Sequence, residues 1–424
     1  MSISHRAIPG DAAKEMLSLW SILSNLHHPT TNPSGFVSLG VAENSLMHTT
    51  LSQHIHANMA LPDIGFTYGD QGIQVRTALA RFLTKHLKPV RALEVGQITQ
   101  TNGCSAAIEF LAWALADEGD VVLLGQPYYG AFPNDVSYRF KTNLTLVPFD
   151  GVDPMSGDII RFYEKHILKA RREKKRVAAI LIAHPHNPLG RCYSVETLTA
   201  LMKLCQKYKC HLISDEIYAL STFENTVDAA SKVPIVPFQS ILTIDPTNII
   251  DPALVHVIWG ISKDFGANGL RFGAIISQAN PALHQAISPA WLFSSTSSLT
   301  EHVVTNMLSD EAWSDEYIRE NQRRLGQQYE HVTRWARENQ LTYAPGVNAG
   351  FFLWVDLGKA YLGNHPGFDG DLDAVLGEAL QRERVFLATG TFCGAEKPGW
   401  FRIVFSQETE YLDEGLKRII AAVQ

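Results

Sequence analysis

The sequence has no long apolar segment, and its charge is spread rather than concentrated. Its longest apolar runs, such as Val177–Ala183, have the length of a strand and are far too short to span a bilayer. No block of five or six like charges occurs, and the net charge is −7 at pH 7. An acidic chain of this kind is a poor candidate for nucleic-acid binding. We therefore expect no nucleic-acid partner and no membrane partner.

Cysteine is scarce, and the first residues lack the apolar core of a signal peptide. The five cysteines are an odd number and lie far apart, which fits a reduced cytoplasmic compartment better than a disulfide framework. Zinc-ligand spacing is also missing, because Cys205 and Cys210 have no second pair and His184 with His186 is an isolated couple. We expect a cytoplasmic protein without a metal site.

The length of the chain and a change in its pattern of predicted helices and strands indicate two domains. With 424 residues, 46% hydrophobic and 19% charged, the chain is typical of a globular enzyme and too long for one ordinary core. Helical patterns alternate with candidate strands at residues 120–124, 144–148, 177–183, 211–214, 255–259 and 274–276. Such alternation predicts βαβ units and a mostly parallel sheet. From about Pro289, a long polar helix over 309–340 and short strands indicate a smaller α+β domain.

Four short segments that follow candidate strands carry the chemistry. The small residues of Thr101–Ala107, at the start of an apolar helix, would let backbone N–H groups approach a phosphate, although glycine and serine are also ordinary capping residues. His184–Gly190 places Asn187 at a strand end, where α/β proteins bind ligands. The acids and tyrosine of Ser214–Tyr218 could form a metal site, a hydrogen-bonding site or a helix cap.

The fourth segment, Ser262–Gly273, contains Lys263 in an apolar, glycine-rich setting. Partial desolvation would lower the pKa of this lysine and provide a nucleophilic amine, although a lysine after a strand is more often a solvated surface residue. Arg271 is a natural phosphate ligand because its planar guanidinium matches phosphate oxygens.

In order and spacing, Asn187-Pro, Asp215-x-x-Tyr218, Lys263 and Arg271 resemble the fold-type I pyridoxal-5′-phosphate (PLP) enzymes, the aspartate-aminotransferase superfamily. Further segments resemble its 1-aminocyclopropane-1-carboxylate (ACC) synthase subgroup: Gly40–Leu46, Gln126–Gly130, Asn187–Gly190, Ser262–Asp264 and Pro398–Arg402. The resemblance covers roughly residue 35 to the end. It implies an α/β fold with a mostly parallel seven-stranded sheet between helices in a large domain, residues 46–288. A smaller α+β domain, residues 289–424, would pack with the N-terminal segment 1–45.

The resemblance also implies roles for individual residues. Lys263 would hold PLP as a Schiff base and move protons at the substrate Cα, while Asp215 would keep the pyridine nitrogen protonated. Asn187 and Tyr218 would hydrogen-bond the phenolic oxygen of the ring. The other cofactor contacts would be Gly103, Cys104, Ser105, Ser262 and Arg271 near the phosphate and Tyr129 on the ring face. The substrate would contact Arg402, through its carboxylate, together with Ala42 and Asn187.

Several positions differ from the family pattern. A serine usually stands three residues before the lysine, and this position is Gly260 here. Because that serine is missing, phosphate binding is expected to depend on Ser262 or on residues 101–105. Cys104 also occupies a position where small residues are usual. Tyr68 is the candidate for reaching the cofactor of a neighbouring subunit, in a homodimer implied by the resemblance, although the loop over residues 68–72 is one residue shorter than the common pattern.

The reaction type is the least determined feature. Glu43 stands in the motif Val-Ala-Glu-Asn that is typical of the ACC-synthase subgroup, and a buried carboxylate there could act as acid, base or selector, or equally as a structural hydrogen-bond partner. We expect β- or γ-elimination, replacement or C–S lyase chemistry in secondary metabolism, with a class I/II aminotransferase as the alternative. A non-catalytic PLP-binding regulator is not expected, because no DNA-binding domain precedes the enzyme body and Lys263, Asp215 and Arg402 are present together.

Overall fold

The computed structural model describes residues 19–69 and 72–424, and its larger part is built on a seven-stranded sheet. The strand order is β2-β8-β7-β6-β5-β3-β4. Only β8 runs antiparallel to its neighbours β2 and β7 among these strands, so the predicted mostly parallel sheet is confirmed. The strands are β2 (Ile98–Thr101), β3 (Val121–Gly125), β4 (Asn143–Val147), β5 (Val177–Ala183), β6 (His211–Asp215), β7 (Val255–Gly260) and β8 (Gly273–Ile276).

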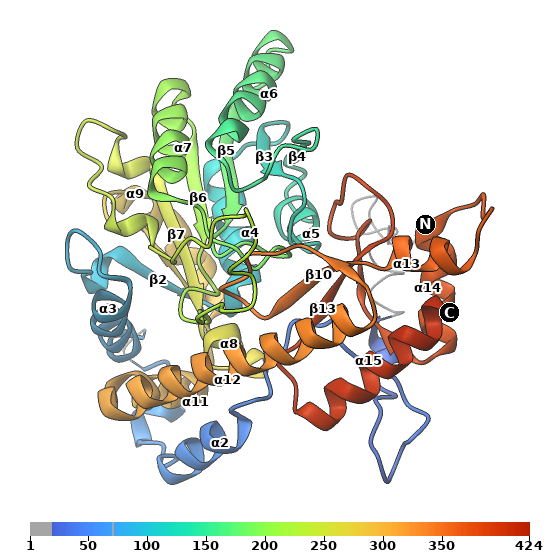
Figure 1. Cartoon of the computed structure of the whole chain (residues 1–424). Helices are drawn as coiled ribbons and strands as arrows, with labels where there is room; N and C mark the ends of the chain where they lie inside the picture. Colours follow the sequence, from blue (N-terminus) through green and yellow to red (C-terminus); the bar gives the residue numbers. More distant parts are fainter. Residues whose placement is uncertain (1–18, 70–71) are drawn as a thin grey trace, which may run out of the picture.

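Local sequence explains these strands and the helices around them. Every residue of β5 is buried, as expected for a central parallel strand that is covered on both faces. The predicted strands coincide with the observed ones within about two residues. In Figure 1 helices surround the sheet: α3 (Ile73–Leu87), α4 (Gly103–Leu115), α5 (Phe132–Ser137), α6 (Ile160–Arg172), α7 (Val195–Tyr208) and α9 (Pro281–Ile287).

The smaller part is an antiparallel four-stranded sheet with helices on it (Figure 1). A separate strand, β1 (Val37–Ser38), pairs in parallel with β11 (Val385–Phe386), so the segment after residue 36 lies with this part. The division at residues 45 and 288 stays a prediction, and residues 1–18 lie outside the described chain. The elements are β9 (Thr342–Tyr343), β10 (Phe352–Asp356), β12 (Ala388–Thr389), β13 (Trp400–Val404), α13 (Leu357–Asn364), α14 (Leu372–Arg382) and α15 (Thr409–Val423).

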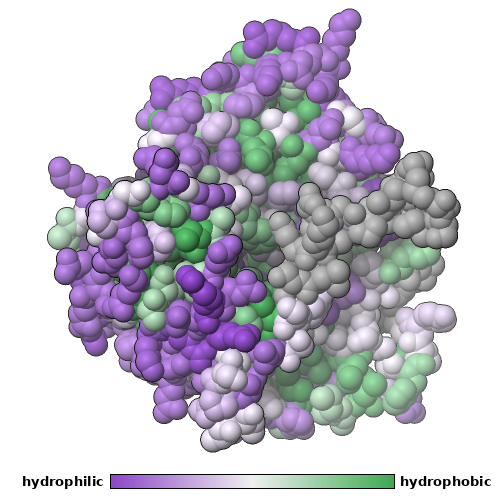
Figure 2. Space-filling view, turned by 90° about the vertical axis from the view of Figure 1, so that its right-hand side faces the viewer, coloured by the Kyte–Doolittle hydropathy of each residue, from purple (hydrophilic) through white to green (hydrophobic). Residues whose placement is uncertain are grey.

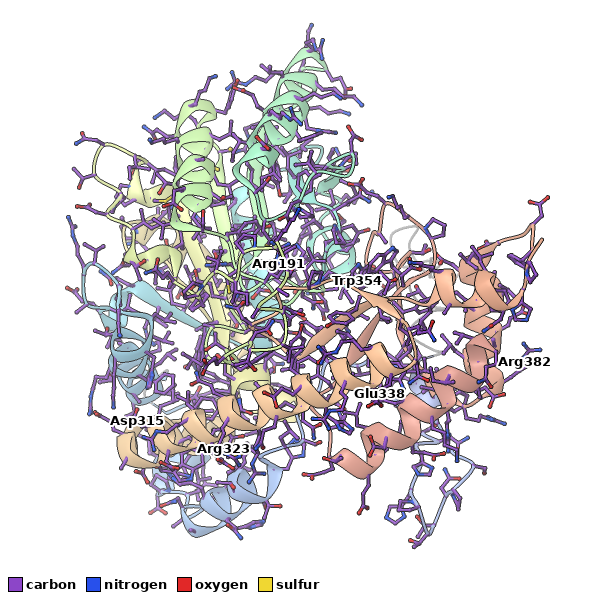
Figure 3. All side chains as sticks on the ribbon, viewed as in Figure 1. Arg191, Asp315, Arg323, Glu338, Trp354 and Arg382 are labelled. Atoms are coloured by element: carbon purple, nitrogen blue, oxygen red, sulfur yellow. The ribbon has the colours of Figure 1, made fainter. Side chains whose placement is uncertain are left out.

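The helices α2 (His48–Ala57), α10 (Trp291–Ser294), α11 (Ser298–Ser309) and α12 (Glu311–Glu338) join the two parts. Helix α12 corresponds to the predicted polar helix over 309–340 and runs beneath both sheets in Figure 1. Figure 3 labels Asp315, Arg323 and Glu338 along it. One face of α12 is buried and includes Tyr317. The Tyr317 hydroxyl donates to the carbonyl oxygen of Phe265 at 2.8 Å. This helix therefore supports the chain just after Lys263.

The apolar segments and the surface of the described chain show how it can meet lipid and water. Within residues 19–69 and 72–424, no helix has both the length and the apolar character needed to cross a bilayer. On the face shown in Figure 2, hydrophilic residues cover most of the surface and hydrophobic residues form smaller patches.

Candidate active site

A cavity lies where β5, β6 and β7 end and α4 begins, which is the edge of the sheet where α/β proteins bind ligands. Three parallel neighbours end together here, so segments that are far apart in sequence meet. The cavity is lined by Cys104, Ser105, Ile108, Tyr129, Ala183, Asn187, Asp215, Ile217, Tyr218, Ser262, Lys263, Asn268 and Arg271. Most of the residues predicted to contact a cofactor thus lie around one space.

Lys263 lies on the short helix α8 (Ile261–Asp264), directly after β7. Its Nζ donates to the carbonyl oxygen of Ala42 at 2.5 Å, and Nδ2 of Asn268 donates to the same oxygen at 3.2 Å. Burial, followed by the nearby positive charge of Arg402, lowers the pKa of the Lys263 amine to about 8. About a tenth of this amine is therefore neutral and nucleophilic at pH 7, and about half at pH 8.

The neighbour of Lys263 fixes the position of helix α8. The buried Asp264 carboxylate accepts hydrogen bonds from Ser221 Oγ at 2.7 Å and from Trp259 Nε1 at 2.9 Å. It also accepts from the backbone N–H of Leu220 at 3.1 Å. Because these partners lie on the segment after β6 and on β7, Asp264 ties helix α8 to both strand ends.

Asp215 is the last residue of β6 and is buried at the base of the cavity. Its carboxylate accepts one hydrogen bond from the backbone N–H of Ile217 at 3.2 Å. Burial raises the pKa of Asp215 to about 7, and Asp135 raises it further while Lys263 opposes the increase. A cationic group placed against this carboxylate would restore its charged form.

The N-terminus of α4 and Arg271 form the basic end of the cavity. Gly103 has φ +80°, and a Cβ on it would lie 2.4 Å from Nη2 of Arg271, so only glycine allows this approach. No side chain of the described residues caps helix α4 at Asn102, which leaves the N–H groups of its first turn for another partner. A helix N-terminus beside a guanidinium favours an anion such as phosphate.

Arg402 reaches the same region from β13 of the smaller sheet and is buried. Its Nη1 donates to Oδ1 of Asn187 at 2.8 Å, and its Nη2 donates to the carbonyl oxygen of Gly40 at 2.6 Å. The guanidinium lies 4.8 Å from the centre of the Phe352 ring. Its Nε is buried and, among the described residues, has no hydrogen-bond partner. A buried cation with an unused N–H is suited to an additional carboxylate.

The turn that carries Asn187 is held from both sides. Arg191, which follows it, forms a bidentate pair with Asp153 at 2.8 and 2.9 Å. The backbone N–H of Asn348, in the smaller part, donates to the carbonyl oxygen of Gly190 at 2.9 Å. Figure 3 labels Arg191 near the middle of the molecule, and it also labels Trp354, the cross-strand neighbour of Arg402. Asn187 therefore sits where the two parts of the chain meet.

Two tyrosines complete the walls. Tyr129 packs edge-on against Phe132 at 5.2 Å, and Tyr218 packs edge-on against Phe351 and Phe352 at 5.3 and 5.1 Å between ring centres. Burial raises the pKa of the Tyr218 hydroxyl well above its usual range. Both phenols are therefore neutral at the cavity.

Two predicted site residues lie elsewhere. The prediction of a buried carboxylate at Glu43 is wrong, because this side chain is exposed. Its backbone explains the orientation, since the carbonyl oxygen of Glu43 accepts from Ser406 Oγ at 2.7 Å and from Gln407 Nε2 at 3.2 Å. Tyr68 is 91% exposed and is not among the cavity-lining residues that the structure describes. Residues 70–71 of its loop lie outside the described chain.

Two residues of the site were not predicted. Asn268 lines the cavity, and its Oδ1 is buried without a hydrogen-bond partner in the described chain. Its position in the glycine-rich segment after Lys263 could have identified Asn268 as a candidate site residue. Asp135 on α5 accepts a hydrogen bond from Ser105, near Arg271, and burial raises its pKa to about 7. Nothing in the local sequence distinguishes Asp135 from an ordinary acid on a helix.

Comparison with known proteins gives a family for this arrangement. A family model described as "Aminotransferase class I and II" matches residues 34–419. The chain is 30% identical over 402 residues to the mouse "Probable inactive 1-aminocyclopropane-1-carboxylate synthase-like protein 2", covering 92% of this chain and 66% of that protein, so it spans slightly less than two thirds of this relative. It is 30% identical over 412 residues to the "Probable aminotransferase sirI" of Leptosphaeria maculans, covering 94% of each.

A solved structure agrees with this assignment at the level of the fold. An archaeal alanine:glyoxylate aminotransferase superposes with a TM-score of 0.78 at 19% identity, covering 98% of this chain and 96% of the other. The family match extends over nearly the whole length and includes both sheets. The chain belongs to the aminotransferase class I and II family, a family of fold-type I PLP enzymes.

Proposed function

We propose that this chain binds PLP in the cavity and acts on an α-amino acid. The observation that carries the proposal is the position of the Lys263 amine, with its lowered pKa, in one cavity with the buried carboxylate of Asp215. A basic end at Gly103 and Arg271 fits the phosphate. The unused hydrogen-bonding atoms, Oδ1 of Asn268 and Nε of Arg402, also fit a polar ligand between them.

Bound PLP supplies an electron-withdrawing ring that stabilises negative charge at the substrate Cα. Lys263 would hold the cofactor and move the Cα proton, and Asp215 would keep a proton on the ring nitrogen. Asn187 and Tyr218 would hydrogen-bond the phenolic oxygen. The cofactor contacts that complete this proposal are Gly103, Cys104, Ser105, Ser262 and Arg271 at the phosphate, with Tyr129 against the ring.

The substrate carboxylate is proposed to bind Arg402. Its Nη1 already holds Asn187, so a carboxylate at the free Nε would lie beside the amide that contacts the cofactor. The carbonyl oxygen of Ala42 accepts from Lys263 and would mark the substrate side of the cavity. This geometry would place the Cα–H bond of an amino acid within reach of Lys263.

For the reaction we propose ACC-synthase-like β- or γ-elimination, replacement or C–S lyase chemistry in secondary metabolism. The Val-Ala-Glu-Asn motif, typical of the ACC-synthase subgroup, supports this branch, and the nearby charge of its Glu43 favours the protonated form of the Lys263 amine. Glu43 is not among the described residues that line the cavity, but its charge near the Lys263 amine would favour a cationic substrate group. Transamination to a 2-oxo acid is the second candidate, supported by the aminotransferase names of the fungal relative and of the archaeal structure.

We also propose a cytoplasmic homodimer with shared active sites. Phe66 and Tyr68 are 77% and 91% exposed on the segment that contacts helix α11, and large exposed aromatics of this kind indicate a protein interface. Tyr68 would then reach the cofactor of the partner subunit. Five free cysteines support a reducing compartment. The common presence of Lys263, Asp215 and Arg402 at one cavity argues against a purely regulatory role.

The test begins with cofactor binding. Purified protein titrated with PLP should develop a visible absorbance band, and Lys263→Ala should abolish it while the exposed control Lys169→Ala keeps it. A band unchanged in Lys263→Ala would refute the assignment of the amine. Incubation with S-adenosylmethionine, cysteine conjugates and common amino acids, with and without a 2-oxo acid, then separates the reactions. Turnover that needs the 2-oxo acid selects transamination, and product without it selects elimination or replacement.

A further inference from the structure

We propose that Cys104 and Gly260 form an interlocking pair at the phosphate end of the cavity, in which the Cys104 thiol occupies the space of a side chain at position 260. The pair is thereby a positioning element for the cofactor phosphate. The cofactor part of this inference rests on the proposed function, whereas the packing part does not.

The pair lies where helix α4 meets the sheet. Gly260, at the end of β7, faces Gly273, at the start of β8, in the antiparallel register of these strands. A Cβ on Gly273 would lie 2.7 Å from the carbonyl carbon of Gly103 and 2.8 Å from the backbone nitrogen of Cys104. The backbone of the first turn of α4 therefore rests directly on Gly273, beside Gly260.

The thiol fills what remains of this contact. A Cβ on Gly260 would lie 2.8 Å from Sγ of Cys104 and 2.7 Å from the carbonyl oxygen of Phe272. Both distances are too short for carbon, so a side chain at position 260 would clash with the thiol of Cys104 as well as with the Phe272 carbonyl oxygen. Cys104 is only 6% exposed, and it lines the cavity beside Ser105.

The chemistry of the thiol agrees with a packing role. Burial raises the pKa of Cys104 well above its usual range, so the group stays a neutral thiol. A neutral thiol adds no negative charge next to the basic end, and it can still act as a weak hydrogen-bond donor. Two of the positions at which the sequence departs from its family pattern therefore lie in contact and compensate each other, because a larger residue at 104 accompanies the loss of a side chain at 260.

A double-mutant cycle tests the pair, with Gly260→Ser, Cys104→Ala and both changes together. Gly260→Ser alone should raise the Kd for PLP by about tenfold or more, the range for overpacking a tight site. In the Cys104→Ala background the increase should be smaller by about threefold or more, because the clash with Sγ is then removed and only the clash with the Phe272 carbonyl oxygen remains. An equal increase in both backgrounds would overturn the proposal and assign the glycine requirement to the Phe272 carbonyl oxygen alone.

Two additions keep the result interpretable. Gly260→Ala introduces only the Cβ and repeats the cycle if the serine variant does not fold, and Cys205→Ala is a control at another buried cysteine that is expected to leave PLP affinity unchanged. Urea unfolding of the cofactor-free variants measures the same coupling without PLP. If the wild-type chain does not bind PLP, the proposed function fails, while coupling in unfolding still supports the pair and its absence refutes it.

Discussion

Arg402 lies in β13 of the smaller sheet and Asn187 in the turn after β5 of the larger one, and Nη1 of Arg402 donates to Oδ1 of Asn187 at 2.8 Å. The residue proposed to bind the substrate carboxylate therefore also orients the amide proposed to contact the cofactor. Because the amide oxygen is occupied, the NH₂ group of Asn187 is the part left to donate into the cavity. Substrate binding at Arg402 would thus change the position of the Asn187 amide, and with it the contact of Asn187 with the cofactor, through one hydrogen bond.

Arg402→Lys should raise KM for any amino-acid substrate by roughly 10- to 100-fold, the value of a lost charge-assisted hydrogen bond. It should also shift the visible absorbance of the bound cofactor, because Asn187 loses its anchor. Steady-state kinetics and the spectrum measure both effects. Arg382→Lys, at the exposed end of α14 (Figure 3), is the control. An unchanged KM would remove Arg402 from the carboxylate site.

The rate of PLP uptake by cofactor-free protein should rise with pH and level off above about 8. The pKa of Lys263 is about 8, and only the neutral amine attacks the cofactor aldehyde. Arg402→Gln removes one cause of the lowered pKa, so the inflection should move to higher pH. Stopped-flow absorbance measures the rate. An inflection near the ordinary lysine value of 10.5 would contradict a desolvated amine.

Asp215→Asn should stabilise the cofactor-free protein at pH 8 while impairing the proposed cofactor chemistry. The folded pKa of about 7 exceeds the unfolded value of 3.8, so the folded state binds more protons and this group makes stability fall as pH rises from about 4 to about 7. Asparagine removes that cost, which we expect to be about 1–3 kcal/mol at pH 8 and near zero at pH 4.

Urea unfolding at the two pH values measures the Asp215→Asn effect. Asp369→Asn, in the exposed loop after α13, makes the same chemical change and should have no comparable effect. Equal stability of Asp215→Asn and wild type at pH 8 would show that Asp215 carries no burial cost.

Asp135→Asn should tighten PLP binding by about threefold to tenfold at pH 8 and change it little at pH 5.5. Asp135 lies beside Ser105 and Arg271, and its pKa of about 7 makes it negative at the higher pH and neutral at the lower one. Its charge would repel a bound phosphate. PLP titrations of the variant, of wild type and of the exposed control Asp158→Asn measure this effect. Weaker binding at pH 8 would instead indicate that Asp135 orients Ser105 productively.

The large sheet and much of the site could be predicted from the sequence because both depend on local signals. Apolar runs such as Val177–Ala183 define strands, and parallel strands bring their carboxyl ends to one edge. Asn187, Asp215 and Lys263, each after such a strand, therefore meet around one cavity.

Other features depend on contacts that no local pattern encodes. The bond from Lys263 to the Ala42 carbonyl joins residues 221 positions apart, and the contact of Cys104 with the space above Gly260 joins a helix to a distant strand. Glu43 is exposed because its backbone binds Ser406, a residue near the other end of the chain. These contacts depend on tertiary packing, so they could not be predicted from motifs and their spacing.

The pairing of β1 with β11 affects when the site can form during protein synthesis. Val37 and Ser38 pair with Val385 and Phe386, the Leu39 carbonyl accepts from the Val404 N–H, and the Gly40 carbonyl accepts from Arg402. The ribosome makes these partners more than three hundred codons apart. The earlier segment must therefore wait for the later one, and the Ala42 carbonyl that meets Lys263 is positioned only after the ribosome has made residues 385–404.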